Sequence, residues 1–351
     1  MLPVYIGIDV GTQGTKAIAY HPSSRTTEDG SDVVMTGTIL ARASKGYDVL
    51  PTTVDGRAEQ DPADWVDAVR HVLKEIVSGL SLAPHADDIV SEKYILSGIG
   101  ISGQQHGMVL LDRNFKPLPP AKLWCDVEAS EESEWIRSTM DASQTDPEAQ
   151  QWSHVLPGFT SPKVLWSIRN EPDIWNRVRW CVLPHDYINL VLRGAHDDCP
   201  PPNISPTTDR GDASGSGLFD TKSGQYNERL ISIIDPSGRY EKSIPKILNP
   251  LDICGYLSLQ WMHKIGLLRK EEKTGLLIPI SVGSGDNMCS ALGVGCVQPG
   301  MAVISLGTSG TIFGVSHSPP SSEVAPFADA TGRYLPLVCI MSCTAVLNSV
   351  L

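Results

Sequence analysis

The chain is short of positive charge. Its 351 residues include 28 lysines and arginines against 40 aspartates and glutamates, which gives a formal net charge of −12. Nucleic acids and anionic membrane surfaces bind proteins mainly through basic side chains that offset phosphate. We therefore expect neither as a partner. A small phosphate-bearing ligand stays compatible with this balance, because backbone N–H groups can hold it locally.

Paired cysteine motifs are also absent. The eight cysteines show no CxxC spacing and lie among apolar stretches, which favours reduced, mostly buried thiols. The first strand-like run begins at about the third residue, so we expect no leader segment and a cytoplasmic location. Residues 334–351 carry no charge, but Pro336 and several polar residues interrupt them. A strand followed by a helix is therefore favoured over a membrane span.

The sequence contains neither a Walker-type phosphate loop nor a GxGxxG fingerprint. It has instead the pentapeptide Gly-Thr-x-Gly-Thr twice, at residues 11–15 and 307–311, each time after an apolar run. Such small-residue turns let backbone N–H groups approach an anion closely, so the repeat predicts two phosphate-binding hairpins facing one nucleotide. The order strand, turn, strand, strand starts again at the second copy, which predicts two similar domains related by duplication.

The hydrophobic pattern along the chain is typical of an α/β fold. A proline in the first turn and a capping aspartate mark the start of a long amphipathic helix at Asp61 and Pro62. The other expected elements are strands over residues 4–9, 16–20, 33–43, 95–101, 278–283, 301–306, 311–315 and 333–341, a short helix over 286–292, and a loop with a hairpin over 197–217.

A carboxylate and a lysine flank the first of the two turns. Asp9 ends the first strand, where it could hold a hydrated Mg²⁺ ion, and Lys16 lies just beyond the turn. This arrangement suits phosphoryl transfer, which depends on positioning and charge neutralisation. An ordinary hairpin with a capping aspartate is the alternative. The second copy has Ser305 at the position of Asp9, so we expect a single metal site.

Two glycine-flanked polar segments follow expected buried strands, where α/β folds usually bind ligands. In residues 103–107, Gln105 and His106 could hydrogen-bond sugar hydroxyls. In residues 283–287, Asp286 could accept a proton from a substrate hydroxyl that attacks phosphorus. A surface turn and a helix N-cap are the respective alternatives, and the spacing alone does not separate them.

Seven segments, in this order along nearly the whole chain, resemble the FGGY family of carbohydrate kinases, within the actin/hexokinase/chaperone ATPase superfamily. The resemblance is strongest to the xylulokinases. The segments are Tyr5-Ile-Gly-Ile-Asp-Val-Gly-Thr, Ile101-Ser-Gly-Gln-Gln-His-Gly, Leu123-Trp-Cys-Asp126, Leu156-Pro-Gly-Phe-Thr-Ser-Pro-Lys163, Leu183-Pro-His-Asp-Tyr187, Gly283-Ser-Gly-Asp-Asn287 and Ser305-Leu-Gly-Thr-Ser-Gly310. The resemblance implies an actin-like ATPase (ribonuclease H-like) duplicated fold. It further implies a complete sugar-binding domain over residues 1–284 and a partial nucleotide-binding domain over 285–351.

The resemblance also implies a role for each candidate residue. It makes Asp286 the catalytic base toward the ketose hydroxyl and Asp9 the carboxylate associated with Mg²⁺. The implied sugar-binding residues are Gln105, His106, Trp124, Asp126, Asp286 and Asn287. The implied ATP-binding residues are Thr12, Gln13, Gly14 and Lys16 at the first turn and Gly307, Thr308 and Ser309 at the second. A core aromatic residue and a turn acid are the alternative for Trp124 and Asp126.

The implied reaction is the ATP- and Mg²⁺-dependent phosphorylation of a ketose, D-xylulose to D-xylulose 5-phosphate. Ribulose, glycerol or sedoheptulose is the alternative substrate, and a truncated, inactive sugar-binding or interaction protein is the alternative class. Glu128 stands where many relatives carry a basic residue, and no glycine-rich adenosine motif precedes Leu351. We therefore expect a truncated second domain that exposes strand edges and apolar surface. The oligomeric state stays open, a homodimer included.

Overall fold

The structure is a computed structural model of the chain. It describes residues 2–26, 33–80, 82, 94–141, 155–268, 275–306, 310–319, 324–340 and 343. Three of the expected phosphate-binding residues, Gly307, Thr308 and Ser309, lie outside these described residues.

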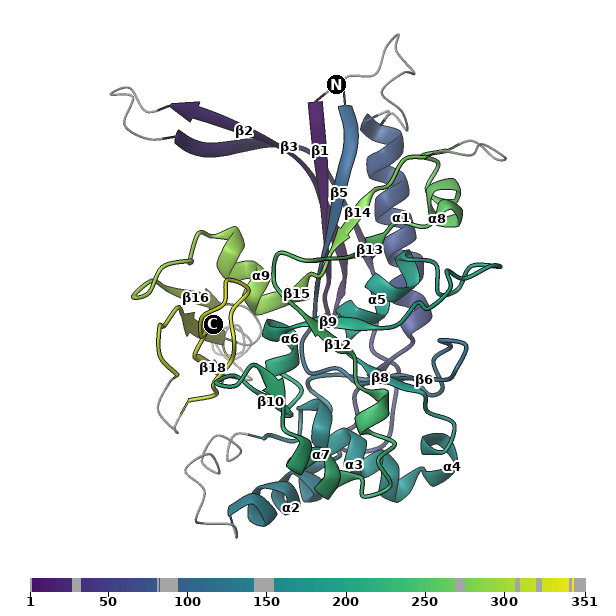
Figure 1. Cartoon of the computed structure of the whole chain (residues 1–351), viewed down its shortest axis with the longest axis vertical. Helices are drawn as coiled ribbons and strands as arrows, with labels where there is room; N and C mark the ends of the chain where they lie inside the picture. Colours follow the sequence, from purple (N-terminus) through teal and green to yellow (C-terminus); the bar gives the residue numbers. More distant parts are fainter. Residues whose placement is uncertain are drawn as a thin grey trace.

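A seven-stranded sheet forms the centre of the part of the chain that the structure describes (Figure 1). Its strand order is β13-β14-β5-β1-β2-β3, and β15 pairs with β5 beside this path. The strands are β1 (Leu2–Val10), β2 (Gly14–Thr26), β3 (Val33–Gly46), β5 (Tyr94–Gly103), β13 (Ile253–Tyr256), β14 (Pro279–Ser281) and β15 (Ser284–Gly285). β1 pairs antiparallel with β2 and parallel with β5. The strands expected over residues 4–9, 16–20, 33–43 and 95–101 are thereby confirmed.

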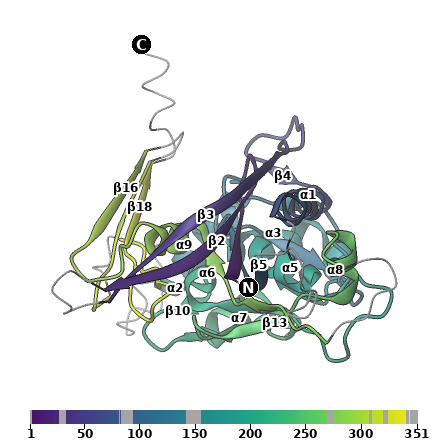
Figure 2. The same ribbon diagram turned by 90° about the horizontal axis from the view of Figure 1, so that it is seen from above.

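The helix expected at Asp61 and Pro62 is α1 (Pro62–Leu80). The Asp61 carboxylate accepts a hydrogen bond of 2.9 Å from the backbone N–H of Ala63, as a capping residue does. The helix buries Trp65, Val69, Leu73, Ile76 and Val77. Burying each such side chain contributes about 1.5–3 kcal/mol. Together with α5 (Pro184–Leu192) and α8 (Leu259–Lys264), α1 covers one face of the sheet over the largest core (Figures 1 and 2).

A helical layer lies beyond the end of the sheet, around a second core. Its elements are α2 (Ser130–Asp141), α3 (Thr160–Asn170), α4 (Pro172–Trp175), α7 (Glu228–Ile234), a 3₁₀ turn at Glu241–Ser243, β6 (Val109–Leu111) and β8 (Trp180–Val182). Other short strands form separate two-stranded sheets: β4 (Glu59–Gln60) with β7 (Ala121–Lys122), β10 (Phe219–Asp220) with β11 (Gln225–Tyr226), and β9 (Thr207–Asp209) with β12 (Lys246–Leu248).

The prediction of a loop and a hairpin over residues 197–217 is wrong for the second half of this segment. There the chain forms β9 and then α6 (Arg210–Ser214). The Asp209 carboxylate caps this helix, because it accepts hydrogen bonds from the backbone N–H groups of Gly211 at 2.8 Å and Asp212 at 2.9 Å. The segment is rich in Pro, Ser, Asp and Gly, a composition that is typical of a surface loop. Asp209 and Asp212 are nevertheless buried.

The last part of the chain that the structure describes forms α9 (Asp286–Gly293) and an antiparallel sheet of β16 (Ala302–Leu306), β17 (Gly310–Gly314) and β18 (Leu337–Ile340). This sheet stands beside the main body (Figure 2) and packs one face against α9. Its other face presents a row of paired residues, Ile304, Ile312 and Val338, which are 49–64% exposed. The expectation of exposed apolar surface is confirmed for these strands.

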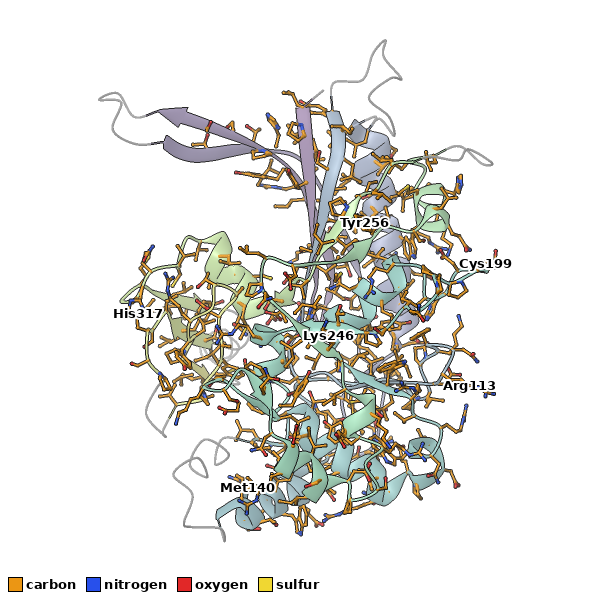
Figure 3. The ribbon with its side chains drawn as sticks, in the orientation of Figure 1. Arg113, Met140, Cys199, Lys246, Tyr256 and His317 are labelled. Carbon is orange, nitrogen blue, oxygen red and sulfur yellow. The ribbon has the colours of Figure 1, made fainter. Side chains whose placement is uncertain are left out.

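All eight cysteines are free thiols, as expected. The expectation that most are buried is wrong, because five are at least partly exposed and only Cys181, Cys254 and Cys296 are buried. Cys199 lies at the outer edge of the molecule (Figure 3). Among the described residues, no helix combines the length and the apolar character that a membrane crossing needs.

Candidate active site

A cleft of about 1280 Å³ opens where the carboxyl ends of β1, β5 and β15 meet α9 and the β16–β18 sheet. Binding at the carboxyl ends of strands is usual in open α/β sheets. Eight residues expected at the site from the sequence line this cleft together: Asp9, Thr12, Lys16, Gln105, His106, Trp124, Asp286 and Asn287. Gln13, Gly14 and Asp126 do not line it.

The pairing of β1 with β5 fixes the position of the Asp9 carboxylate. Asp9 on β1 lies opposite Ser102 on β5, and Ser102 lies opposite Ser284 on β15. The Ser102 hydroxyl donates a hydrogen bond of 2.9 Å to Asp9 Oδ1. Burial raises the pKa of Asp9, while the Ser102 hydrogen bond and the Lys16 charge oppose this. The sequence interpretation overlooked Ser102. The feature that could have identified it as a site residue is its place at the end of a buried strand.

The donors around Asp9 fit a magnesium ion. Asp9 and Asp286 supply carboxylates to the cleft, and hard divalent cations prefer oxygen ligands. Over the described ranges, no group of three or more His, Cys, Asp or Glu residues is placed to hold an ion. Magnesium often takes one or two protein carboxylates and completes its shell with water and substrate phosphates. Asp9 is the residue that would hold it here.

Asp286 is the first residue of α9, just after the two-residue strand β15. Its Oδ1 accepts a hydrogen bond of 2.8 Å from the backbone N–H of Asn287. Burial, together with the neighbouring charges of Asp9 and Asp212, raises its pKa to about 7. A carboxylate with a pKa near neutrality can accept a proton from a reacting hydroxyl at physiological pH.

Polar groups beside Asp286 are arranged to hold hydroxyls. Asn287 Nδ2 donates a hydrogen bond of 2.9 Å to Gln105 Oε1. Gln105 Nε2 is buried without a protein partner among the described residues, which leaves a donor for a ligand. His106 Nδ1 lies 2.6 Å from the carbonyl oxygen of Gly215 and therefore donates to it. Burial lowers the pKa of His106 to about 4, so the neutral ring keeps Nε2 as an acceptor.

The turn over residues 11–15, where the sequence predicts phosphate binding, is fixed by side-chain hydrogen bonds. The Thr12 hydroxyl donates to Gln104 Oε1 and accepts from Trp124 Nε1, both at 2.9 Å. Gln60 Nε2 donates to the Thr12 carbonyl at 2.7 Å, and Gln104 Nε2 donates to Gln60 Oε1 at 3.1 Å. Trp124 therefore both lines the cleft and holds the turn. The sequence interpretation missed Gln60 and Gln104, which lie 44 residues apart and meet only through the sheet.

The comparisons with known proteins agree with this geometry. The sequence model described as "FGGY family of carbohydrate kinases, N-terminal domain" matches residues 4–293. The chain belongs to this family. The xylulose kinase of Haemophilus influenzae is 34% identical over 349 residues, which cover 97% of this chain and 63% of the relative. The chain thus spans less than two thirds of the length of this relative.

Solved structures support the same assignment. The crystal structure of xylulose kinase from Rhodospirillum rubrum matches with a TM-score of 0.76 and 25% identity, over 98% of this chain and 62% of that one. Plasmodium falciparum glycerol kinase with ADP matches with a TM-score of 0.75 and 19% identity, over 99% of this chain and 63% of that one. The second likeness shows the fold alone. The expected actin-like ATPase fold of the FGGY kinases is confirmed.

Asp126, which the family resemblance assigned to the sugar site, does not line the cleft. It is fully buried, and its carboxylate accepts hydrogen bonds from the backbone N–H groups of Ala58 at 3.0 Å and Glu128 at 3.2 Å. These bonds hold a loop that arrives from nearly 70 residues earlier, so Asp126 serves as a turn acid behind the cleft. Gln13 is exposed at the tip of the first turn, and its carbonyl oxygen accepts a hydrogen bond of 3.4 Å from the Tyr47 N–H.

Glu128, where the chain departs from the FGGY pattern, has two cationic partners. Its carboxylate lies 2.7 Å from Arg57 and 2.6 Å from Lys122. Burial opposes the charged form, but the hydrogen bonds from Arg57 and Lys122 hold the pKa of Glu128 below its ordinary value. An acid here thus completes a local ion-pair network away from the cleft.

Gly14 has a structural reason for its residue type. A Cβ atom at this position would lie 2.6 Å from the carbonyl oxygen of Lys45 and 3.0 Å from the Cα of Gly46 on β3. We expect Gly14→Ala to lower the free energy of unfolding by about 1–3 kcal/mol, because the hairpin must open to admit the methyl group. Urea unfolding measures this loss. Gly79→Ala in α1 is the control, since no atom lies within 4 Å of its added Cβ; an equal loss in both variants would contradict the explanation.

Proposed function

We propose that this chain forms the sugar site, and the first part of the phosphate site, of an ATP-dependent ketose kinase whose substrate is D-xylulose. The observation that carries the proposal is the Asp286 carboxylate, which has a pKa of about 7 and faces the cleft beside Asn287 and Gln105. Relatives named xylulose kinase support the sugar. The proposal includes no nucleic-acid or membrane partner, and it places the protein in the cytoplasm.

The proposed chemistry assigns one task to each group. A sugar hydroxyl is oriented by the free Gln105 Nε2 donor and the His106 Nε2 acceptor. Asp286 accepts the proton of that hydroxyl as its oxygen forms a bond to the γ-phosphorus of ATP, and the bond from that phosphorus to the bridging oxygen of ADP breaks. Mg²⁺, held by Asp9, supplies charge neutralisation for the phosphates when bound. Lys16, which is paired with Asp9 across β1 and β2, adds a positive charge beside it.

The test uses the chain as it stands. Titration calorimetry with D-xylulose, D-ribulose and glycerol measures the sugar site, and a coupled assay of ADP release measures turnover with Mg·ATP. We expect D-xylulose to bind at least tenfold more tightly than the other two. Preference for glycerol or D-ribulose would replace the proposed substrate. Binding of D-xylulose without ADP release would assign this chain a sugar-binding role only, and no binding of any of the three would reject the proposal.

A further inference from the structure

Lys163 is a fully buried cation that the proposed chemistry does not use. It lies in the first turn of α3, and its Nζ donates hydrogen bonds to three backbone carbonyl oxygens. The acceptors are Leu123 at 2.5 Å, Gly158 at 2.6 Å and His106 at 3.0 Å. An ammonium group has three protons, so each proton has a neutral acceptor.

The position of Lys163 does not favour folding by itself. Lysines are rarely fully buried, and a cation in the first turn of a helix opposes the helix dipole. Burial lowers the pKa of Lys163 to about 7, although the nearby Asp126 and Cys125 raise it. The ammonium form is therefore costly at neutral pH, and some other benefit must account for it.

The three carbonyl groups belong to segments that carry aromatic rings at the cleft or packed against a ring of the cleft. His106 itself lines the cleft, Trp124 follows Leu123, and Phe159 follows Gly158. The rings of His106 and Phe159 stack with centroids 4.5 Å apart and planes within 7°. Lys163 thus connects two segments that line the cleft, through His106 and Trp124, with a third segment whose Phe159 ring stacks on His106.

The backbone at this junction is close-packed and strained. His106 has a φ of 61°, in the left-handed region that non-glycine residues avoid. Its carbonyl oxygen accepts a second hydrogen bond, of 3.2 Å, from the Thr160 hydroxyl. A Cβ at Gly158 would lie 2.3 Å from the carbonyl oxygen of Trp124, so these two segments touch through their backbones. Such strain persists only where surrounding contacts hold it.

We propose that Lys163 is a positioning residue of the sugar site, whose buried ammonium fixes His106, Trp124 and Phe159 relative to one another. Without it, the three carbonyl dipoles lose their common partner and the segments can separate. A small shift of groups that orient a ligand can cost orders of magnitude in activity. The inference rests on the proposed function for the meaning of the cleft, but the arrangement of the three segments can be measured separately.

The experiment compares two variants of Lys163 with a matched lysine variant. Lys163→Met keeps the length of the side chain and removes its donors, and Lys163→Ala leaves space that propylammonium can fill. Lys74→Met on the exposed face of α1 is the control. Amide hydrogen exchange is followed in residues 103–108, 123–127 and 156–161, and D-xylulose affinity is followed by calorimetry. Propylammonium is compared with tetramethylammonium, which has the charge but no N–H donor.

We expect Lys163→Met to speed exchange at least tenfold in all three segments together and to weaken D-xylulose binding about tenfold or more. We expect propylammonium, and not tetramethylammonium, to restore slow exchange and D-xylulose binding in Lys163→Ala. This rescue tests the proposal even if Lys163→Met fails to fold. Unchanged exchange in the three segments, or equal rescue by both cations, would overturn the proposal. If the unaltered chain binds no sugar, the proposed function fails while the exchange comparison still decides the role of Lys163.

Discussion

Replacing Asp286 with Asn is expected to lower the rate of ADP release about 10²- to 10⁴-fold while the affinity for D-xylulose changes less than about fivefold. The amide keeps the size and the hydrogen bond from the Asn287 N–H, but it cannot accept a proton from the attacking hydroxyl. Steady-state kinetics and calorimetry on the same preparation separate the two effects. Asp64→Asn on the exposed face of α1 is the control and should leave both values unchanged.

The pH dependence makes this prediction sharper. Because the pKa of Asp286 is raised to about 7, the unaltered chain should lose activity as the pH falls through 7, where the base becomes protonated. Residual activity in Asp286→Asn should not follow this titration. The raised pKa also means that ionised Asp286 opposes folding above its unfolded pKa. The variant should therefore be more stable than the unaltered chain at pH 8, by an amount on the order of 1 kcal/mol. A variant that loses activity and stability together would instead indicate misfolding.

Local patterns in the sequence were sufficient for the main elements. The apolar run of β1 and the helical period in α1 depend on neighbouring residues alone, and both elements were predicted. Asp286 was singled out in the same way, because a glycine-rich bend between an apolar strand and a helix is a local signal, and its catalytic role stays a prediction. The structure places Asp286 at the start of α9 and beside the cleft.

Contacts between distant segments could not be predicted in this way. The backbone N–H of Ala58, which donates to the Asp126 carboxylate, comes from a loop nearly 70 residues earlier. An acid beside Trp124 was therefore assigned to the sugar site, although it does not line the cleft. Lys163 appeared only as the last letter of a family motif, since its carbonyl partners span residues 106–158. Backbone acceptors leave no mark in a sequence, because every residue type carries the same carbonyl group.

A buried charge cluster behind the cleft was likewise invisible in the sequence. His185 of α5 is fully buried, with Nδ1 at 2.5 Å from Asp212 and Nε2 at 3.3 Å from Asp186. Asp209, on the neighbouring strand β9, accepts a hydrogen bond of 2.8 Å from the hydroxyl of Ser284, two residues before Asp286. The cluster therefore supports the turn that carries the proposed base, Asp286. Removing the cation of this cluster, His185, should affect the whole site.

We expect His185→Gln to lower the free energy of unfolding by about 3–5 kcal/mol at pH 6, because it leaves buried carboxylates without a cation. Burial alone would lower the pKa of His185, but Asp186 and Asp212 raise it to about 10. A pKa raised above its unfolded value gives stability that is fully present below about pH 6.5 and is lost as the pH rises toward 10. The difference between the two proteins should shrink over that window.

Urea unfolding of both proteins from pH 6 to pH 10 measures this difference directly. His71→Gln is the matched control, because His71 lies 3.4 Å from Glu75 on the exposed surface of α1, where such a pair contributes less than about 1 kcal/mol. A difference for His185→Gln that does not change with pH would mean that His185 is neutral in the folded protein.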